Sequence, residues 1–136
     1  MDSTDDLEDR LPPSIATDPW ERALREVLDG MDREVAQIVV EGPNDRQALR
    51  KAGLDSPIEE CSQTAGLTGF ADQLTGDPIA ILTDFDDAGR RLNGRLRDVL
   101  PDARVATHWR REVGLVLTQH GHYEIESLNN VFKRRL

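Results

Sequence analysis

The chain contains few residues of several kinds, and each shortage excludes a class of protein. Cys61 is the only cysteine among 136 residues, so an intrachain disulfide and a cysteine-based zinc site are both excluded. No apolar run approaches the roughly 18 residues that a membrane span needs. The acidic N-terminus lacks the apolar core of a secretory signal. From these absences we expect a cytoplasmic protein with no membrane partner.

Lysine is almost absent. Only Lys51 and Lys133 occur, and the formal net charge is −9. An acidic, lysine-poor composition is typical of proteins from salt-loving organisms, because the Debye length falls to about 3 Å in molar salt and screens the self-repulsion of such a surface. Overall acidity therefore does not exclude a nucleic-acid ligand here, and local arginine clusters become the informative signal.

Short apolar segments alternate with amphipathic ones along the chain, which predicts an α/β protein. The runs at 35–40 and 79–83 are rich in Ile and Val and end in polar turns, as buried parallel strands do. Shorter strands are expected at 56–62 and 103–107. The segment from His108 is compatible with a helix or a strand, and its apolar spacing favours a helix. We therefore predict a single Rossmann-like domain with a mainly parallel sheet of about four strands flanked by helices.

Composition divides the chain into four segments. Asp18-Pro19 is a strong helix start, because aspartate caps a helix and proline suits its first turn. The acidic residues before it have no apolar periodicity. The expected segments are an acidic disordered tail (1–13), an N-terminal helix (14–34), the α/β domain (35–128) and a helical basic end (129–136).

Acidic residues stand directly after two of the predicted strands. Glu41 follows the first strand, and Asp84 and Asp86 follow the strand at 79–83. Carboxyl ends of parallel strands share the sheet edge where ligands bind, so the three carboxylates are expected to meet if the strands are neighbours. Such an oxygen-rich group suits Mg²⁺, or Glu41 acts as a general acid or base. The alternative is that Asp86 or Asp87 only caps the following helix.

Three arginines lie close to these acids in the sequence: Arg46, Arg90 and Arg91. A guanidinium group pairs bidentately with phosphate, so these arginines are candidates for holding a phosphate group of a ligand. The alternative is that they only compensate the acids in surface ion pairs. Arg110-Arg111 and Lys133-Arg134-Arg135 are further candidates for phosphate contacts.

Two motifs together resemble a Toprim domain. They are Val39-Val40-Glu41-Gly42-Pro43-Asn44-Asp45 and Leu82-Thr83-Asp84-Phe85-Asp86-Asp87-Ala88-Gly89-Arg90. They match the strand-end glutamate and the Asp-x-Asp-x-x-Gly-Arg form found in that family. Toprim domains occur in topoisomerases, bacterial-type primases and ribosomal-RNA maturation ribonucleases. The resemblance covers about residues 35–107 and is closest to small stand-alone Toprim proteins of archaea, haloarchaea among them.

The resemblance implies a Mg²⁺-dependent site, with Mn²⁺ as a substitute, that acts on nucleic-acid phosphodiesters. Glu41 would be the catalytic acid or base and also a metal ligand. Asp84 and Asp86 would be the other metal ligands. The expected partner is therefore RNA or DNA.

The resemblance also implies supporting roles for neighbouring residues. Asp45 and Asp87 would be additional ligands or would orient the ligands. Gly42 matches the glycine after the family glutamate and permits a tight turn. Glu126 is similar to a late acidic position of the ribonuclease-like members.

Two functions are expected from this resemblance. The first is phosphodiester chemistry, with a nuclease favoured over a nucleotidyl transferase. The second is a non-catalytic module that binds nucleic acid or a protein and recruits a larger RNA- or DNA-processing machine. Topoisomerase activity is not expected, because that reaction needs a tyrosine on a separate domain and Tyr123 is the only tyrosine here. The small size makes a homodimer or a partner protein plausible.

Overall fold

One parallel sheet of three strands stands at the centre of the fold. The computed structural model describes residues 18–63 and 66–132. The predicted tail, the first four residues of the predicted helix 14–34 and the last four residues of the predicted basic end therefore lie outside it. Strand β1 (Gln37–Val40) lies between β2 (Ile58–Glu60) and β3 (Ile79–Ile81), and both neighbours run parallel to it.

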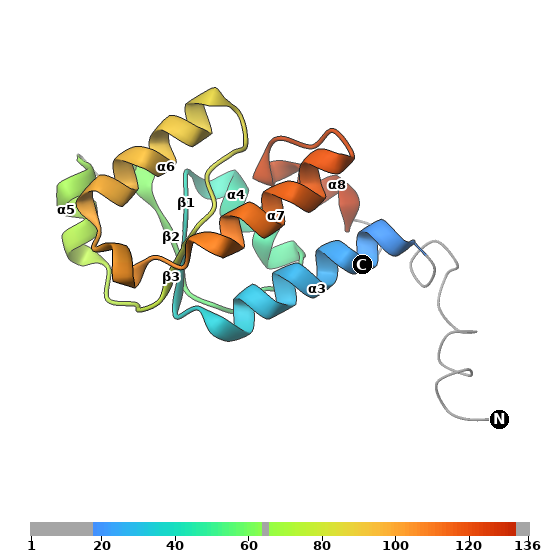
Figure 1. Ribbon diagram of the computed structural model, residues 1–136, viewed down its shortest axis with the longest axis horizontal. Coiled ribbons are helices and arrows are strands. Elements are labelled where there is room, and N and C mark those ends of the chain that lie inside the picture. Colours follow the sequence, from blue (N-terminus) through green and yellow to red (C-terminus); the bar gives the residue numbers. More distant parts are fainter. Residues whose placement is uncertain (1–17, 64–65, 133–136) are drawn as a thin grey trace.

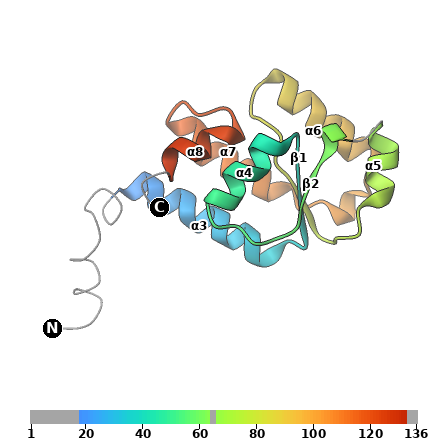
Figure 2. The same cartoon turned by 180° about the vertical axis from the view of Figure 1, so that it is seen from behind.

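Helices cover both faces of this sheet, as Figures 1 and 2 show. Ile38 and Val40 face one apolar cluster, and Val39 faces the other. The cluster around Val39 is closed by α5 (Leu67–Gln73) and α6 (Asp87–Val99). The opposite cluster is closed by α3 (Pro19–Glu34), α4 (Pro43–Lys51), α7 (Thr107–Gln119) and α8 (Leu128–Val131). Within the part of the chain that the structure describes, no helix is long and apolar enough to cross a membrane.

Local signals in the sequence set the ends of several helices. The Asp18 carboxylate accepts hydrogen bonds from the backbone N–H groups of Trp20 and Glu21, at 3.0 and 3.2 Å, with Pro19 as the first residue of α3. Gly53, just beyond α4, has a φ of +93°, a conformation that glycine adopts without strain. The predicted helix start at Asp18-Pro19 is confirmed for the described residues.

The prediction of a fourth strand at 103–107 is wrong. Residues Asp102–Arg104 form a 3₁₀ turn, and Val105 makes only an isolated parallel bridge with Ile79. The Arg104 side chain donates to the backbone carbonyls of Leu74 and Gly76, and α7 begins at Thr107. Too little extended chain therefore remains for a strand ladder. The prediction of a helix after His108 is confirmed by α7.

Candidate functional site

The two acidic motifs meet at the carboxyl edge of the sheet. Glu41 directly follows β1, and Asp84 lies three residues after β3 ends. The strands are neighbours, with Val39 paired to Ile81 and the Leu82 N–H donating to the Val39 carbonyl at 2.8 Å. The juxtaposition that the parallel topology predicts is therefore present.

Asp45 joins this group from the first turn of α4, and its pKa is raised by its surroundings. It is 9% exposed, and burial raises its pKa to about 6, although a hydrogen bond from the Gly42 N–H acts in the opposite direction. The negative charges of Asp84, Glu41 and Glu126 raise this pKa further. Asp45 therefore lies within the electrostatic field of three other carboxylates, which come from the end of β1, the turn after β3 and the 3₁₀ helix Ile125–Ser127.

Backbone N–H groups hold three of the acids in place. Asp84 Oδ1 accepts from the Ile125 N–H at 2.9 Å, and Asp45 Oδ2 accepts from the Gly42 N–H at 3.2 Å. Asp86 caps α6 by accepting from the Gly89 N–H at 2.8 Å. Of the two capping residues considered from the sequence, Asp86 is the one that caps. Among the described residues, only one of the two Asp86 carboxylate oxygens accepts this capping hydrogen bond.

The donor set fits a hard cation such as Mg²⁺ or Mn²⁺. The residues are carboxylates only, and their mutual repulsion is relieved by a bound cation. In the described part of the chain, no three His, Cys, Asp or Glu side chains form a ready-made metal group. Mg²⁺ does not need one, because it is usually held by one or two carboxylates and keeps several waters. Asp84 and Glu41 at the shared strand edge are the residues best placed to hold it.

Gly89 lets α6 begin directly against the turn after β3 that carries Asp84 and Asp86, called the acid turn below. A Cβ at this position would lie 1.9 Å from the Asp84 carbonyl oxygen, which no side chain tolerates. The Thr83 hydroxyl donates to the Gly89 carbonyl at 2.6 Å. The glycine of the second motif therefore has a packing reason of its own, since only glycine allows this approach.

Arg110 on α7 clamps the acid turn from the other side. Its guanidinium group donates to the backbone carbonyls of Thr83 and Asp84, the latter at 2.8 Å, and lies 4.7 Å from the centre of the Phe85 ring. Burial and the neighbouring Arg90 charge lower its pKa to about 10, against the influence of Asp84 and Asp86. Arg110 therefore stays charged at neutral pH and places a positive charge beside the acids.

Replacing Arg110 with glutamine is expected to lower the free energy of unfolding by about 1–3 kcal/mol, because two backbone carbonyls lose a charged donor in a partly buried turn. The change is measured by urea unfolding. Arg111→Gln is the matched control, since Arg111 is exposed and a surface change of this kind costs at most about 0.5 kcal/mol. Equal effects of the two substitutions would contradict the stabilisation of this turn by the Arg110 hydrogen bonds.

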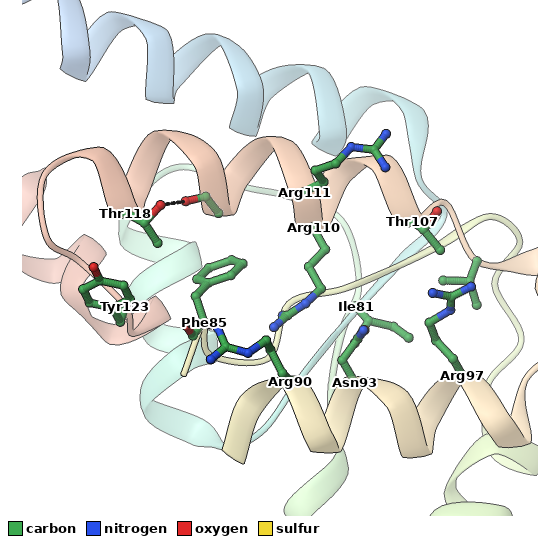
Figure 3. A pocket seen from close by; sticks show the side chains of 12 residues that line it. Ile81, Phe85, Arg90, Asn93, Arg97, Thr107, Arg110, Arg111, Thr118 and Tyr123 are labelled. Carbon is green, nitrogen blue, oxygen red and sulfur yellow. Dashed lines mark hydrogen bonds between the residues drawn. The ribbon is translucent and has the colours of Figure 1, made fainter. Parts of the chain in front are cut away.

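A cavity of about 600 Å³ opens beside the acid turn, between α6 and α7 (Figure 3). Helix α6 contributes Arg90, Asn93 and Arg97 to its lining, and α7 contributes Arg110, Arg111 and two threonines. Phe85 and Tyr123 supply aromatic walls, and no acidic side chain of the described residues lines the cavity. Although the chain has a net charge of −9, the charged side chains that line this cavity are all arginines.

The three arginines predicted to bind phosphate lie in different surroundings. Arg90 lines the cavity, pairs with Asp87 and donates to the Phe85 carbonyl at 3.0 Å. Arg91 is exposed on α6 outside the cavity lining. Arg46 Nε lies 2.6 Å from Glu60, as an ion pair without an aligned hydrogen bond, and its Nη2 donates to the β2 backbone.

The sequence alone did not predict that these side chains line a common cavity, although their spacing along α6 and α7 was informative. Arg90, Asn93 and Arg97 are spaced by three and four residues, so they share one face of α6. Thr107, Arg110, Gly114 and Thr118 repeat the same spacing on α7. Two polar stripes at helical spacing indicate two helices that face a common polar space, but the partner of each stripe cannot be read from spacing alone.

Comparison with known proteins gives two similarities, and no family model matches the chain. A UPF0292 protein of Pyrococcus furiosus is 32% identical over 83 residues, which are 60% of this chain and 63% of that protein. The chain thus spans less than two thirds of this relative. A solved structure of a protein from Aquifex aeolicus is similar with a TM-score of 0.58 and 27% identity, over 79% of this chain and 94% of that one. The α/β fold with a small parallel sheet is therefore shared with a solved structure.

Proposed function

We propose that this protein is a Toprim-like, Mg²⁺-dependent enzyme that acts on nucleic-acid phosphodiesters, with cleavage favoured over nucleotidyl transfer. One observation carries the proposal. A cluster of carboxylates at the ends of two neighbouring parallel strands adjoins an arginine-lined cavity. Mg²⁺-dependent phosphodiester chemistry uses both parts, because the cation takes oxygen ligands and arginine side chains pair with phosphates.

The residues divide the work in this proposal. Asp84 is oriented by the Ile125 N–H and would hold the cation together with Glu41. Bound Mg²⁺ would neutralise phosphate charge and stabilise the leaving oxygen. Glu41 is exposed, so its carboxylate can reach a proton on an attacking or departing oxygen. Arg90 lies at the boundary between acids and cavity, where it can contact the phosphate next to the one attacked.

The test is a titration with Mg²⁺ or Mn²⁺ in high salt, which compares the wild type with Asp84→Asn/Asp86→Asn. Metal binding is measured by calorimetry, and cleavage is measured on labelled RNA and DNA together. We expect metal binding at least about tenfold weaker in the double variant, and cleavage of the preferred nucleic acid at background level.

Asp98→Asn/Asp102→Asn is the matched control, because it removes two exposed carboxylates from the far end of α6 and the turn beyond it. We expect it to bind metal and cleave like the wild type. A wild type that binds no cation at millimolar concentration would overturn the proposal.

A non-catalytic binding module is the second candidate, and a specific observation favours it. Asp84, Asp86 and Asp45 each already accept a backbone hydrogen bond, as acids with a purely structural role do. Such a module would still bind nucleic acid after Asp84→Ala and would show no metal-dependent turnover in the wild type.

A further inference from the structure

The charge in the α6–α7 cavity is only partly compensated. Arg90 pairs with Asp87, and Arg110 donates to backbone carbonyls. Arg97 and Arg111 are exposed, and neither pairs with an acidic side chain within residues 18–63 and 66–132. The Arg97 guanidinium on the α6 wall therefore remains available for an anionic ligand, whereas the Arg111 side chain extends from the other side of α7, away from α6 (Figure 3).

The cavity also offers flat surfaces for an aromatic ligand. Tyr123 is 51% exposed at one end of it. Its position is set by the chain, because the Tyr123 carbonyl accepts from the Phe85 N–H at 2.7 Å. The Arg110 guanidinium lies over the Phe85 ring, and arginine and aromatic planes are both surfaces on which nucleobases stack.

Hydrogen-bonding groups without charge complete the lining. Asn93 on α6 and Thr107 and Thr118 on α7 line the cavity, and the Thr118 hydroxyl donates to the Gly114 carbonyl at 2.7 Å. Amide and hydroxyl groups can donate and accept, so they match sugar hydroxyls and base edges. The volume of about 600 Å³ lies in the range of sites that enclose small ligands, roughly 300–1,000 Å³.

From this combination we infer that the α6–α7 cavity is a binding subsite for single-stranded nucleotides, with a phosphate on Arg97 and a base stacked on Tyr123. The ligand is either the unpaired end of a nucleic-acid strand or a free nucleoside phosphate, because both carry the same groups. Binding in the cavity does not depend on the proposed function, but cleavage of the bound strand rests on it. The cavity adjoins the acid turn through Phe85 and Arg90.

Single strands are favoured over duplexes for a physical reason. Bases inside a duplex are stacked and paired, so their faces cannot reach an aromatic side chain on a protein wall. A strand with unpaired bases can place a phosphate on Arg97 and a base on Tyr123 at the same time. The proposed subsite would thus deliver an unpaired segment to the carboxylates.

The test measures binding by fluorescence anisotropy in EDTA, which prevents metal-dependent cleavage. The probes are fluorescein-labelled octamers of thymidylate and of uridylate, titrated at salt concentrations from about 0.1 to 1 M. A duplex of the same length, inorganic phosphate and a free nucleoside monophosphate serve as competitors. Competition by the monophosphate identifies a free nucleotide as a ligand, and failure to compete identifies the strand.

Arg97→Gln is expected to weaken octamer binding roughly fivefold at low salt and to reduce the slope of log affinity against log salt by about 0.7, the value for one phosphate contact on a single strand. Arg95→Gln is the matched control, because Arg95 is an exposed arginine of the same helix outside the cavity lining. Equal losses in the two variants would show diffuse surface attraction and overturn the subsite.

Tyr123→Leu is expected to weaken octamer binding about five- to a hundredfold by removing one stacked base, whereas Tyr123→Phe keeps the ring and the affinity. Circular dichroism at each salt concentration verifies that every variant is folded. Unchanged binding by Tyr123→Leu would reduce the cavity to a simple anion site and overturn the nucleotide assignment. A folded wild type that binds neither octamer overturns it as well.

The two proposals fail in distinguishable ways. Binding in EDTA with this pattern of variants, but no cleavage in Mg²⁺, would refute the enzyme and leave the subsite. Cleavage that is insensitive to Arg97→Gln and Tyr123→Leu would support the enzyme and refute the subsite.

Discussion

Gly89→Ala is expected to lower the free energy of unfolding by about 3 kcal/mol, the upper end of the usual range of about 1–3 kcal/mol for overpacking, because the clash is with backbone atoms. The new methyl carbon would lie 1.9 Å from the Asp84 carbonyl oxygen and 2.5 Å from the carbonyl carbon. These are backbone atoms that Arg110 already holds, so they cannot move aside without cost. Urea unfolding followed by circular dichroism measures the change.

Gly94→Ala on the same helix is the matched control. No heavy atom lies within 4 Å of a Cβ built at Gly94, and the position is exposed. Alanine there is expected to stabilise the protein by about 0.5–1 kcal/mol through helix propensity. If Gly89→Ala were as stable as Gly94→Ala, α6 would not begin against the acid turn as described.

Asp45→Asn is expected to raise the free energy of unfolding by about 2–3 kcal/mol at pH 8 in EDTA. Burial, and the charges of Asp84, Glu41 and Glu126, raise the pKa of Asp45 to about 6 in the folded protein, from 3.8 in the unfolded chain. The ionised carboxylate is therefore unfavourable in the folded state. Asparagine removes the charge and keeps an oxygen that can accept the Gly42 N–H.

The sign of the pH dependence follows from this shift. Between about pH 4 and 6 the folded protein binds more protons at Asp45 than the unfolded chain does, so this residue makes stability fall as the pH rises through that window. The carboxyl group is neutral in both states only well below pH 4, so the difference between the wild type and Asp45→Asn should shrink to about 0.5 kcal/mol at pH 4 and disappear at lower pH. Unfolding at pH 4, 6 and 8 measures it, with Asp98→Asn as an exposed control.

A stabilisation by Asp45→Asn that is the same at pH 4 and pH 8 would show that charge is not its cause. It would also remove the electrostatic argument that the four carboxylates form one group. The experiment is thus a direct test of the candidate site in the absence of any ligand.

The sequence by itself determined most of the local structure. Alternating polarity and apolar runs placed three strands, and Asp18-Pro19 marked a helix start that the structure confirms. These features depend on residues within one or two turns of each other, so their physical causes are present in a short window. The sequence also placed Glu41 and Asp84 directly after strands, but they share one edge because β1 and β3 are neighbours, which the tertiary structure decided.

Only the tertiary structure decided which distant groups act together. Arg110 reaches Thr83 across 27 residues, and the Ile125 N–H reaches Asp84 across 41. The raised pKa of Asp45 and the arginine-lined cavity arise from such contacts, as does the anchoring of Arg104 that leaves 103–107 without a strand ladder. Spacing shows that a helix face is polar, but the packing of α6 against α7 determines what that face meets.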